Sequence, residues 1–351
     1  MVVARGDGGD VAGALAVAPC LAVAGERAEA EGVRPQSAGI GGWRCHTGRM
    51  TDVGIVDLYV TLGAVEVPRD VVRVSGPDAV AYLQGQLSQN VEDLDVGATT
   101  WTFVLQPTGK VDVWGRVTRT ADDTFVLDVE AGSGESLVGR LKRFLMRTKA
   151  EVELLDDWRC IVLRGPGAVE AAAAAEVTAA VQVPAGWPGV EGACLLGPDV
   201  VLPAGIPLVS PEAVEATRIT AGVPAMGSEL TERTIPAEAG QWVIDASVDF
   251  TKGCFTGQEL VARIDSRGGN VPRHLRGLVL DPEATLPAPG SRVRVGDTEV
   301  GEVTSAAYSP ALGAPVALAY VGRSVEPPAE ATVVTDDDKA AAQVRQLPLV
   351  G

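Results

Sequence analysis

The strongest constraint on the fold of this chain is a change of pattern near Pro272. Beyond it, short apolar stretches alternate with Gly, Pro and Asp turns, a pattern typical of a small antiparallel barrel or sandwich. Before it, strand and helix patterns are mixed, which indicates an α+β body with antiparallel sheets. We therefore expect a body over 51–271 and a C-terminal β-barrel domain over 272–351. The expected barrel strands are 275–280, 291–295, 299–305, 315–321 and 331–334.

The first half of the body has the pattern of a strand, a helix and an antiparallel meander. Alternation over 71–74 predicts a strand, and Pro77 and Asp78 are typical of a helix start. A second helix is expected over 135–149, with an apolar face against the core. The expected meander strands are 100–105, 111–118 and 125–129.

The helix expected over 135–149 carries an unusual charge pattern for so acidic a chain. Five basic residues occur within ten positions that hold no acid. A solvated helix face near a C-terminus is the interpretation we favour, and a patch for an anionic ligand tail or RNA is the alternative. The five residues are Arg140, Lys142, Arg143, Arg147 and Lys149.

The second half of the body continues with alternating elements. Strands are expected over 158–163 and 194–196, and helices over 168–181 and 211–218. Cys160 and Cys194 lie in the two apolar strands and are expected in the core. Between 183 and 192 the composition indicates a loop. The segment 226–246 is too long for a simple connection, so it is a candidate lid or ligand-lining segment.

Residues 1–50 lack convincing periodicity and are expected to be a flexible extension, or to precede the true start at Met50. Cys20, Cys45 and His46 would then lie outside the functional body. The five cysteines of the chain are scattered and form no CxxC pair, which indicates neither a disulfide framework nor a metal site. His274, between arginines, is expected to be a surface residue.

Charge and hydropathy exclude several function classes. The formal net charge of −17 disfavours direct nucleic-acid binding and anionic membranes, because both need a basic face. No apolar run approaches the length of a transmembrane helix. We expect a cytoplasmic protein.

The segment 249–260 has the composition of a reactive site. Thr256 and Glu259 match a capping box that would start a helix at Thr256, and Gly268 and Gly269 would end it. Cys254 would then lie just before a helix N-terminus and beside Lys252, an electropositive setting that favours a thiolate. We therefore predict Cys254 and Lys252 as catalytic residues; the alternative is an inert buried cysteine.

The segment KGCFTGQE (252–259), continuing to Arg263 and Arg267, resembles the signature of the YgfZ-type folate-binding proteins. These are relatives of the glycine-cleavage aminomethyltransferase that serve in iron–sulfur cluster assembly or repair. Further matching segments extend the resemblance from about residue 71 to 348. They are VSGPD (74–78), LQGQLS (83–88), RITAGVP (218–224) and GEVTS (301–305).

The resemblance implies a body of two α/β subdomains and a barrel, arranged as a cloverleaf around a channel that receives tetrahydrofolate. It also implies iron–sulfur client or scaffold proteins as partners, and an indirect link to tRNA modification. Candidate folate-binding residues are Arg218, Glu259, Arg263 and Arg267. The last three are spaced by four on one helix face, so surface pairing of Glu259 with Arg263 is the alternative.

One difference between this chain and the aminomethyltransferases concerns the catalytic residues. The aminomethyltransferase relatives carry an acidic pair where this chain has Val113 and Trp114, and Asp112 is one position out of register. Whether the chain is an enzyme therefore stays open. Three hypotheses remain: a folate-binding iron–sulfur factor, a one-carbon transferase using an unlocated acid, and a non-catalytic partner-binding protein. Asp112, Glu191 and Asp245 are candidates for that acid.

Overall fold

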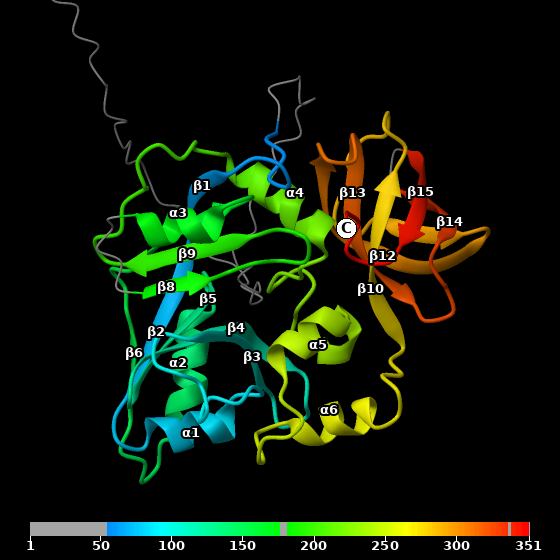
Figure 1. The fold of residues 1–351 in the computed structure, drawn as a ribbon. Helices are drawn as coiled ribbons and strands as arrows, with labels where there is room; N and C mark the ends of the chain where they lie inside the picture. Colours follow the sequence, from blue (N-terminus) through cyan, green and yellow to red (C-terminus); the bar gives the residue numbers. More distant parts are fainter. Residues whose placement is uncertain (1–54, 176–180, 336–337, 351) are drawn as a thin grey trace, which may run out of the picture. The chain divides into compact units, whose positions relative to one another are not determined.

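The computed structural model describes residues 55–175, 181–335 and 338–350, all within one compact unit of the chain (Figure 1). The expectations for residues 1–50, including Cys20, Cys45, His46 and Met50, lie outside the described residues.

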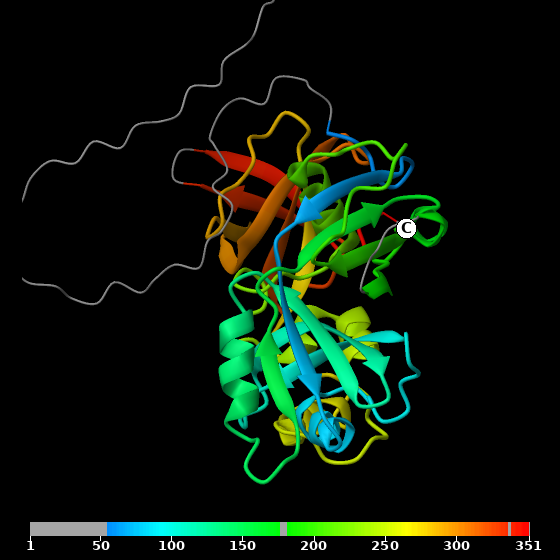
Figure 2. The ribbon, with the colours of Figure 1, turned by 90° about the vertical axis from the view of Figure 1, so that its left-hand side faces the viewer.

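The first sheet of the body is antiparallel and confirms the predicted meander. Its strands follow the order β3-β4-β5-β2-β6. Helices α1 (Ala79–Gln86) and α2 (Gly134–Lys142) pack on it through Leu83, Leu137 and Leu141, which are fully buried in its core. Figures 1 and 2 both show α2 beside this sheet. The strands are β2 (Arg69–Ser75), β3 (Thr99–Leu105), β4 (Val111–Ala121), β5 (Thr124–Glu130) and β6 (Glu151–Leu154).

Helix α2 is shorter than predicted. It ends at Lys142 instead of continuing to Lys149. Arg147 has a φ of 67°, in the left-handed region, which no helix interior can contain. The expected long basic helix face is therefore wrong: the segment after α2 is an exposed loop that turns back into β6.

The second sheet takes its strands from separate parts of the chain, in the antiparallel order β1-β7-β9-β8. Strand β1 precedes the whole first sheet in sequence yet pairs with β7. Helix α3 (Ala168–Ala174) covers one face. Strands β1 and β8 were not predicted. The strands are β1 (Gly63–Val67), β7 (Arg159–Arg164), β8 (Val181–Pro184) and β9 (Gly192–Gly197).

Four short helices follow the two sheets. Helix α4 (Pro211–Ala221) starts at Ser210, whose Oγ accepts a hydrogen bond from the amide of Ala213, as its Ser-Pro start favours. The segment 226–246 is not a structureless loop, because it contains the 3₁₀ helix η1 (Pro236–Ala239) and most of α5 (Gln241–Ser247). Helix α6 (Gln258–Asp265) comes last.

The C-terminal part is a closed barrel in the order β10-β13-β12-β11-β14-β15, so the predicted barrel is confirmed. Its last strand was not predicted. No helix in the described ranges is long and apolar enough to cross a membrane. The strands are β10 (Arg273–Leu280), β11 (Arg292–Val295), β12 (Thr298–Ser309), β13 (Ala314–Gly322), β14 (Ala329–Val334) and β15 (Lys339–Arg345).

A buried ion pair joins strands within the first sheet. Asp128 on β5 accepts hydrogen bonds from Arg116 on β4 and from Arg69 on β2. Burial alone would raise the pKa of Asp128, but the two guanidiniums outweigh it and lower the pKa. The ionised carboxylate of Asp128 therefore stabilises the folded protein at neutral pH. This stabilisation is lost only as the pH falls through the lowered pKa of Asp128.

Replacing Asp128 by Asn should lower the free energy of unfolding by about 3–5 kcal/mol at pH 7, because two guanidiniums lose their counter-charge. Urea unfolding measures this, and the difference from wild type should shrink only below the usual pH range of aspartate. Asp122→Asn, in an exposed turn, is the control and should stay within about 0.5 kcal/mol of wild type. Equal stability of Asp128→Asn and wild type would contradict this account.

Candidate functional site

The loop that carries Cys254 connects α5 to α6 and is tied down at both ends. The amide of Asp249 donates to the carbonyl of Ser88 (3.0 Å), and the amide of Thr256 donates to the carbonyl of Gly85 (3.1 Å). Within the loop, Asp249 Oδ1 accepts hydrogen bonds from the amides of Thr251 and Lys252. The loop therefore presents the thiol of Cys254, which is exposed, on a backbone fixed against the end of α1.

Lys252 points into the protein. Its Nζ donates to the carbonyl oxygens of Gln84 (2.7 Å), Leu87 (2.6 Å) and Gln89 (2.9 Å). These carbonyls lie at and beyond the C-terminus of α1, where the helix dipole favours a cation. Burial lowers the pKa of Lys252 to about 8. Three carbonyl acceptors account for all three ammonium donors, so Lys252 fixes the loop to α1, and its predicted catalytic role stays untested.

The predicted capping box is wrong. Helix α6 begins at Gln258, its N-cap is Gly257, and the side chain of Thr256 makes no cap hydrogen bond. Instead, Gln258 Oε1 accepts a hydrogen bond from the amide of Phe255 (3.0 Å). The predicted end is confirmed, since Gly268 and Gly269 have positive φ and the amide of Gly269 donates to the carbonyl of Ile264.

A tertiary contact requires a glycine at position 257. Its φ is 82°, and a Cβ here would collide with the carbonyl oxygen of Gln106 and come within 2.8 Å of the Leu105 side chain. The start of α6 therefore packs directly on the β3–β4 turn, which contains Gly109. This close approach, which a local capping rule does not include, decides where the helix begins.

A cavity of about 530 Å³ lies where α4, α5 and α6 meet β10 and the segment 346–348. Trp242 and Phe250 contribute aromatic surface to its lining. Its polar lining groups include Gln241, Asp265 and Arg276. Cys254 is not among the lining residues. This size and this mixture of aromatic and polar groups are those of small-molecule sites.

Arg276 is the cationic side chain in this lining, and sequence reasoning missed it. Its Nε is buried without a hydrogen-bond partner, and Nη1 has only a long contact (3.5 Å) to the carbonyl of Leu275. Burial lowers its pKa. His274, expected on the surface, is half-buried in the same lining, and burial together with Arg276 lowers its pKa. Strand alternation gave no signal here, because the cavity is formed by segments distant in sequence.

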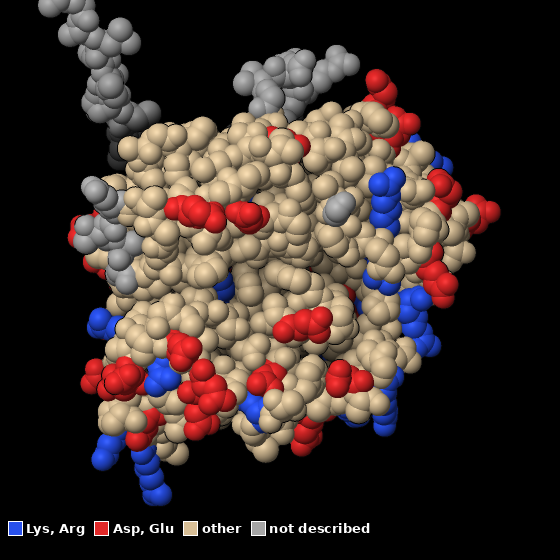
Figure 3. All heavy atoms as spheres, in the orientation of Figure 1, with Lys and Arg blue, Asp and Glu red and all other residues tan. Residues whose placement is uncertain are grey.

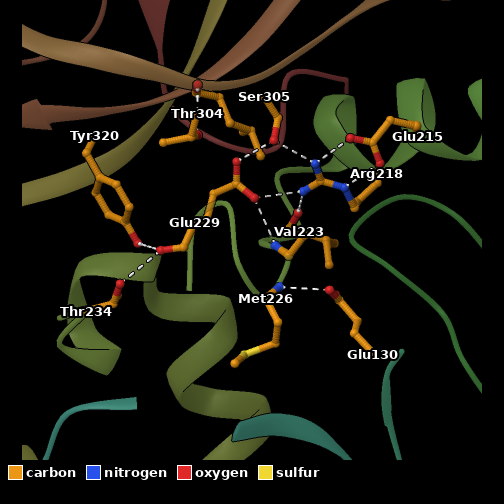
Figure 4. A network of polar contacts seen from close by, with 12 residues as sticks. Glu130, Glu215, Arg218, Val223, Met226, Glu229, Thr234, Thr304, Ser305 and Tyr320 are labelled. Atoms are coloured by element: carbon orange, nitrogen blue, oxygen red, sulfur yellow. Dashed lines mark hydrogen bonds and ion pairs between the residues drawn. The ribbon is translucent and has the colours of Figure 1, made fainter. Parts of the chain in front are cut away.

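Arg218 occupies a buried polar network between the body and the barrel (Figure 4). Nε and Nη2 donate to the carboxylate of Glu215 (2.8 and 2.6 Å). Nη1 donates to the carbonyl of Val223 and to Glu229, and Nη2 also donates to Ser305 Oγ. These contacts use all five N–H groups of a guanidinium, so this arrangement leaves none for a folate carboxylate. Its predicted role in folate binding stays a prediction.

The other three predicted folate ligands lie on or just after α6. Glu259, Arg263 and Arg267 are all exposed. None of them forms an ion pair with another residue in the described part of the chain. Their neighbour Asp265 lines the cavity, whereas these three do not.

Comparison with known proteins identifies the family. The GCVT N-terminal domain matches residues 52–185, and the glycine cleavage T-protein C-terminal barrel domain matches residues 273–350. Together the two matches cover more than half of the chain. This chain belongs to the glycine cleavage T-protein family. The resemblance inferred from the segment 252–259 is confirmed at this level.

Individual family members give the degree of similarity. An uncharacterized protein of Haemophilus influenzae is 31% identical over 202 residues, which are 57% of this chain and 67% of that protein. The mitochondrial iron–sulfur cluster assembly factor IBA57 homolog of Pyricularia oryzae is 32% identical over 214 residues, which are 57% of this chain and 53% of that protein. This chain thus spans about half the length of the second relative.

Aminomethyltransferases are also related. That of Streptomyces avermitilis is 28% identical over 298 residues, covering 76% of this chain and 79% of that protein. The crystal structure of the aminomethyltransferase T of the Bartonella henselae glycine cleavage system superposes with a TM-score of 0.68 at 21% identity, covering 85% of this chain and 90% of that one. This match establishes the shared fold.

The strand on which the resemblance implied an acidic pair, β4, carries Trp114 there. Trp114 stacks on Trp101 with ring centroids 4.2 Å apart, Trp242 meets both rings edge-on, and Trp114 Nε1 donates to Ser247 Oγ (2.9 Å). Asp112 sits opposite a register shift and pairs with Arg140 (3.4 Å). These three rings pack together in one cluster beside α5, the helix that carries Trp242.

None of the three candidate acids named from the sequence lines the cavity. Glu191 accepts a hydrogen bond from the amide of Gly167, and Asp245 accepts one from Gln241 Nε2. Asp112 forms an ion pair with Arg140. Among the described residues that line the cavity, the one carboxylate is Asp265.

Replacing Lys252 by Met should lower the free energy of unfolding by about 2 kcal/mol, because three carbonyls at the end of α1 lose their donor. Thermal or urea unfolding measures this change. Lys110→Met, on the β3–β4 turn, removes the same charge without such a network and should stay within about 0.5 kcal/mol of wild type. Equal effects of the two variants would show that Lys252 does not fix the loop.

Proposed function

We propose that this chain is a tetrahydrofolate-binding protein that acts in iron–sulfur cluster assembly or repair through the thiol of Cys254. The observation that carries the proposal is the exposed thiol on a tightly fixed loop, in a chain that has Val113 and Trp114 where the aminomethyltransferases are expected to carry an acidic pair. A protein that presents a thiol and has no carboxylate at these two positions is suited to exchanging a cluster or a disulfide bond. The Pyricularia oryzae relative is named as an iron–sulfur cluster assembly factor homolog, which supports the same function.

The cavity residues fit a folate. Trp242 and Phe250 offer aromatic surface to a pterin ring, and Arg276 offers a buried donor without a protein partner to a carboxylate. An unpartnered buried Nε costs free energy, and an anionic ligand would remove that cost. Bound tetrahydrofolate would supply a carrier for one-carbon groups.

Cys254 cannot hold a cluster by itself, because iron–sulfur clusters are generally held by several cysteine ligands. The cluster is therefore a cargo, and its remaining ligands come from a client or scaffold protein or from a small thiol. Reversible thiol chemistry at Cys254 is the other form of the same proposal. We expect both to take place in the cytoplasm, with no direct contact to nucleic acid or membrane and only an indirect effect on tRNA modification.

A folate-dependent aminomethyl or other one-carbon transferase is the second candidate. The aminomethyltransferase relatives, which align over three quarters of this chain, favour it. It would require Asp265 or a substrate group as the proton acceptor, because no other carboxylate lines the cavity among the described residues. A non-catalytic partner-binding protein is the third.

In cells that lack the chromosomal gene, a Cys254→Ala variant should fail to restore the activity of an iron–sulfur enzyme, because the exchanging thiol is gone. The same purified variant should keep the wild-type unfolding temperature and the wild-type affinity for tetrahydrofolate, because Cys254 does not line the cavity. Enzyme assays in extracts and calorimetric titration measure the two properties.

A matched control is Ser266→Ala, which removes an exposed hydroxyl after α6 and should restore the enzyme fully. Full restoration by Cys254→Ala as well would overturn the role of the thiol. Restoration together with folate-dependent one-carbon transfer by the purified protein would favour the second candidate, and restoration without transfer would favour the third.

A further inference from the structure

We infer that residues 142–149, here called the basic loop, dock an acidic segment of the partner protein that meets Cys254. This inference rests on the proposed function and adds the chemistry of the partner to it. The basic loop begins at Lys142, the last residue of α2, and ends shortly before β6; all of it was expected to be helical.

The basic loop concentrates positive charge in an acidic chain. None of its basic side chains forms a hydrogen bond or ion pair with a side chain or carbonyl in the part of the chain that the structure describes, and all are exposed. They are Lys142, Arg143, Arg147 and Lys149. The whole chain has a formal charge of −17, and on the face drawn in Figure 3 acidic side chains are scattered among basic ones. An acidic partner would be repelled over much of the surface and attracted here, which orients its approach.

The same loop exposes apolar surface. The side chain of Met146 is 88% exposed and that of Phe144 is 42% exposed. The guanidinium of Arg140 lies 4.3 Å from the centroid of the Phe144 ring, which fixes one face of that ring. An exposed, flexible methionine is suited to contacting apolar side chains of varied shape. The partner segment should therefore carry an apolar residue among its acids.

The backbone of the basic loop is held in place before any partner binds. The amide of Lys149 donates to Asp78 Oδ2 (2.7 Å), its carbonyl accepts from the amide of Asp78 (3.2 Å), and the amide of Thr148 donates to the carbonyl of Leu145. Arg147 is the single non-glycine residue with positive φ among those the structure describes. A loop that is already ordered loses little conformational entropy on binding.

The basic loop and the Cys254 loop are both linked to α1. Gly85 accepts the hydrogen bond from Thr256 in the Cys254 loop. The next residue, Gln86, accepts a hydrogen bond from Nη1 of Arg140 (3.4 Å), the residue that contacts Phe144. The basic loop itself is bonded to Asp78, at the start of α1. A partner bound to the basic loop is thereby placed beside the short helix whose other end holds the Cys254 loop.

A protein partner is favoured over RNA. Nucleic-acid binding requires an extended row of phosphate contacts, whereas the basic loop is short and the acidic residues Asp78 and Glu151 lie at its end. The one aromatic ring is already covered on one face by Arg140, which leaves less surface for stacking on a base. A few carboxylates with an apolar side chain match these features.

The test is fluorescence anisotropy with a labelled short peptide of alternating Glu and Leu, its Gln-for-Glu counterpart, and an oligouridylate. The Glu peptide should bind wild type and lose about tenfold in affinity or more with Arg143→Glu plus Arg147→Glu, at about 50 mM salt. Arg292→Glu plus Lys339→Glu, two exposed barrel positions, makes the same charge change and should leave the affinity unchanged. The Gln peptide should bind weakly to all three proteins.

Equal losses in the two double variants, or equal binding of the Glu and Gln peptides, would overturn the inference. Tighter binding of oligouridylate than of the Glu peptide, lost in the loop variant, would assign the surface to nucleic acid instead. Cys254→Ala should bind the Glu peptide like wild type. If Cys254→Ala restores the enzyme in cells, the role of the thiol is overturned but the docking inference is not. If the Glu peptide does not bind the basic loop, the docking inference is overturned but the result for the thiol is not.

Discussion

The guanidinium of Arg218 is the interaction on which the rest of this structure depends. It joins helix α4, the segment after it through Val223 and Glu229, and the barrel strand β12 through Ser305. Glu229 is fully buried, so its carboxylate requires the positive charge of Arg218, and the buried guanidinium requires the carboxylate. Apolar packing of Ile219 on α4 against Leu318 in the barrel surrounds it.

This junction positions the cavity. The end of α4 contributes Ala221 and Gly222 to the lining, and the barrel contributes Leu275 and Arg276. The Arg218 network holds α4 against the barrel. The cavity therefore exists before a ligand binds, and its aromatic and cationic side chains keep fixed positions relative to one another. The thiol is fixed separately, by Lys252 and the end of α1. The cavity and the Cys254 loop are thus supported by different contacts.

Much of the fold could be predicted, because the meander and the barrel have clear two-residue periodicity and turn residues at their ends. Strand β1 escaped prediction because it pairs with β7, which is far away in sequence. Helix α2 was predicted too long because apolar spacing continued past Lys142, whereas Arg147 has a left-handed backbone. The capping box at Thr256 failed because the packing of Gly257 on Gln106 decides the helix start.

A candidate site could be named from the sequence only where its residues are close together along the chain. The Cys254 segment could be found because its chemistry is local. Arg276 and His274 could not, since only the tertiary structure brings β10 next to α5 and α6. The folate-binding role predicted for Arg218 stays a prediction, and the sequence did not show that Glu215, Glu229 and Ser305 accept hydrogen bonds from its guanidinium.

The most direct test of the account is an anaerobic calorimetric titration of tetrahydrofolate into wild type, Arg276→Gln and Arg292→Gln. The account predicts one site in wild type, an unchanged affinity in Arg292→Gln, and an affinity about tenfold lower in Arg276→Gln, because a charged hydrogen bond to the ligand is lost. No binding to the folded wild type, or equal binding to all three proteins, would contradict the assignment of this cavity to folate.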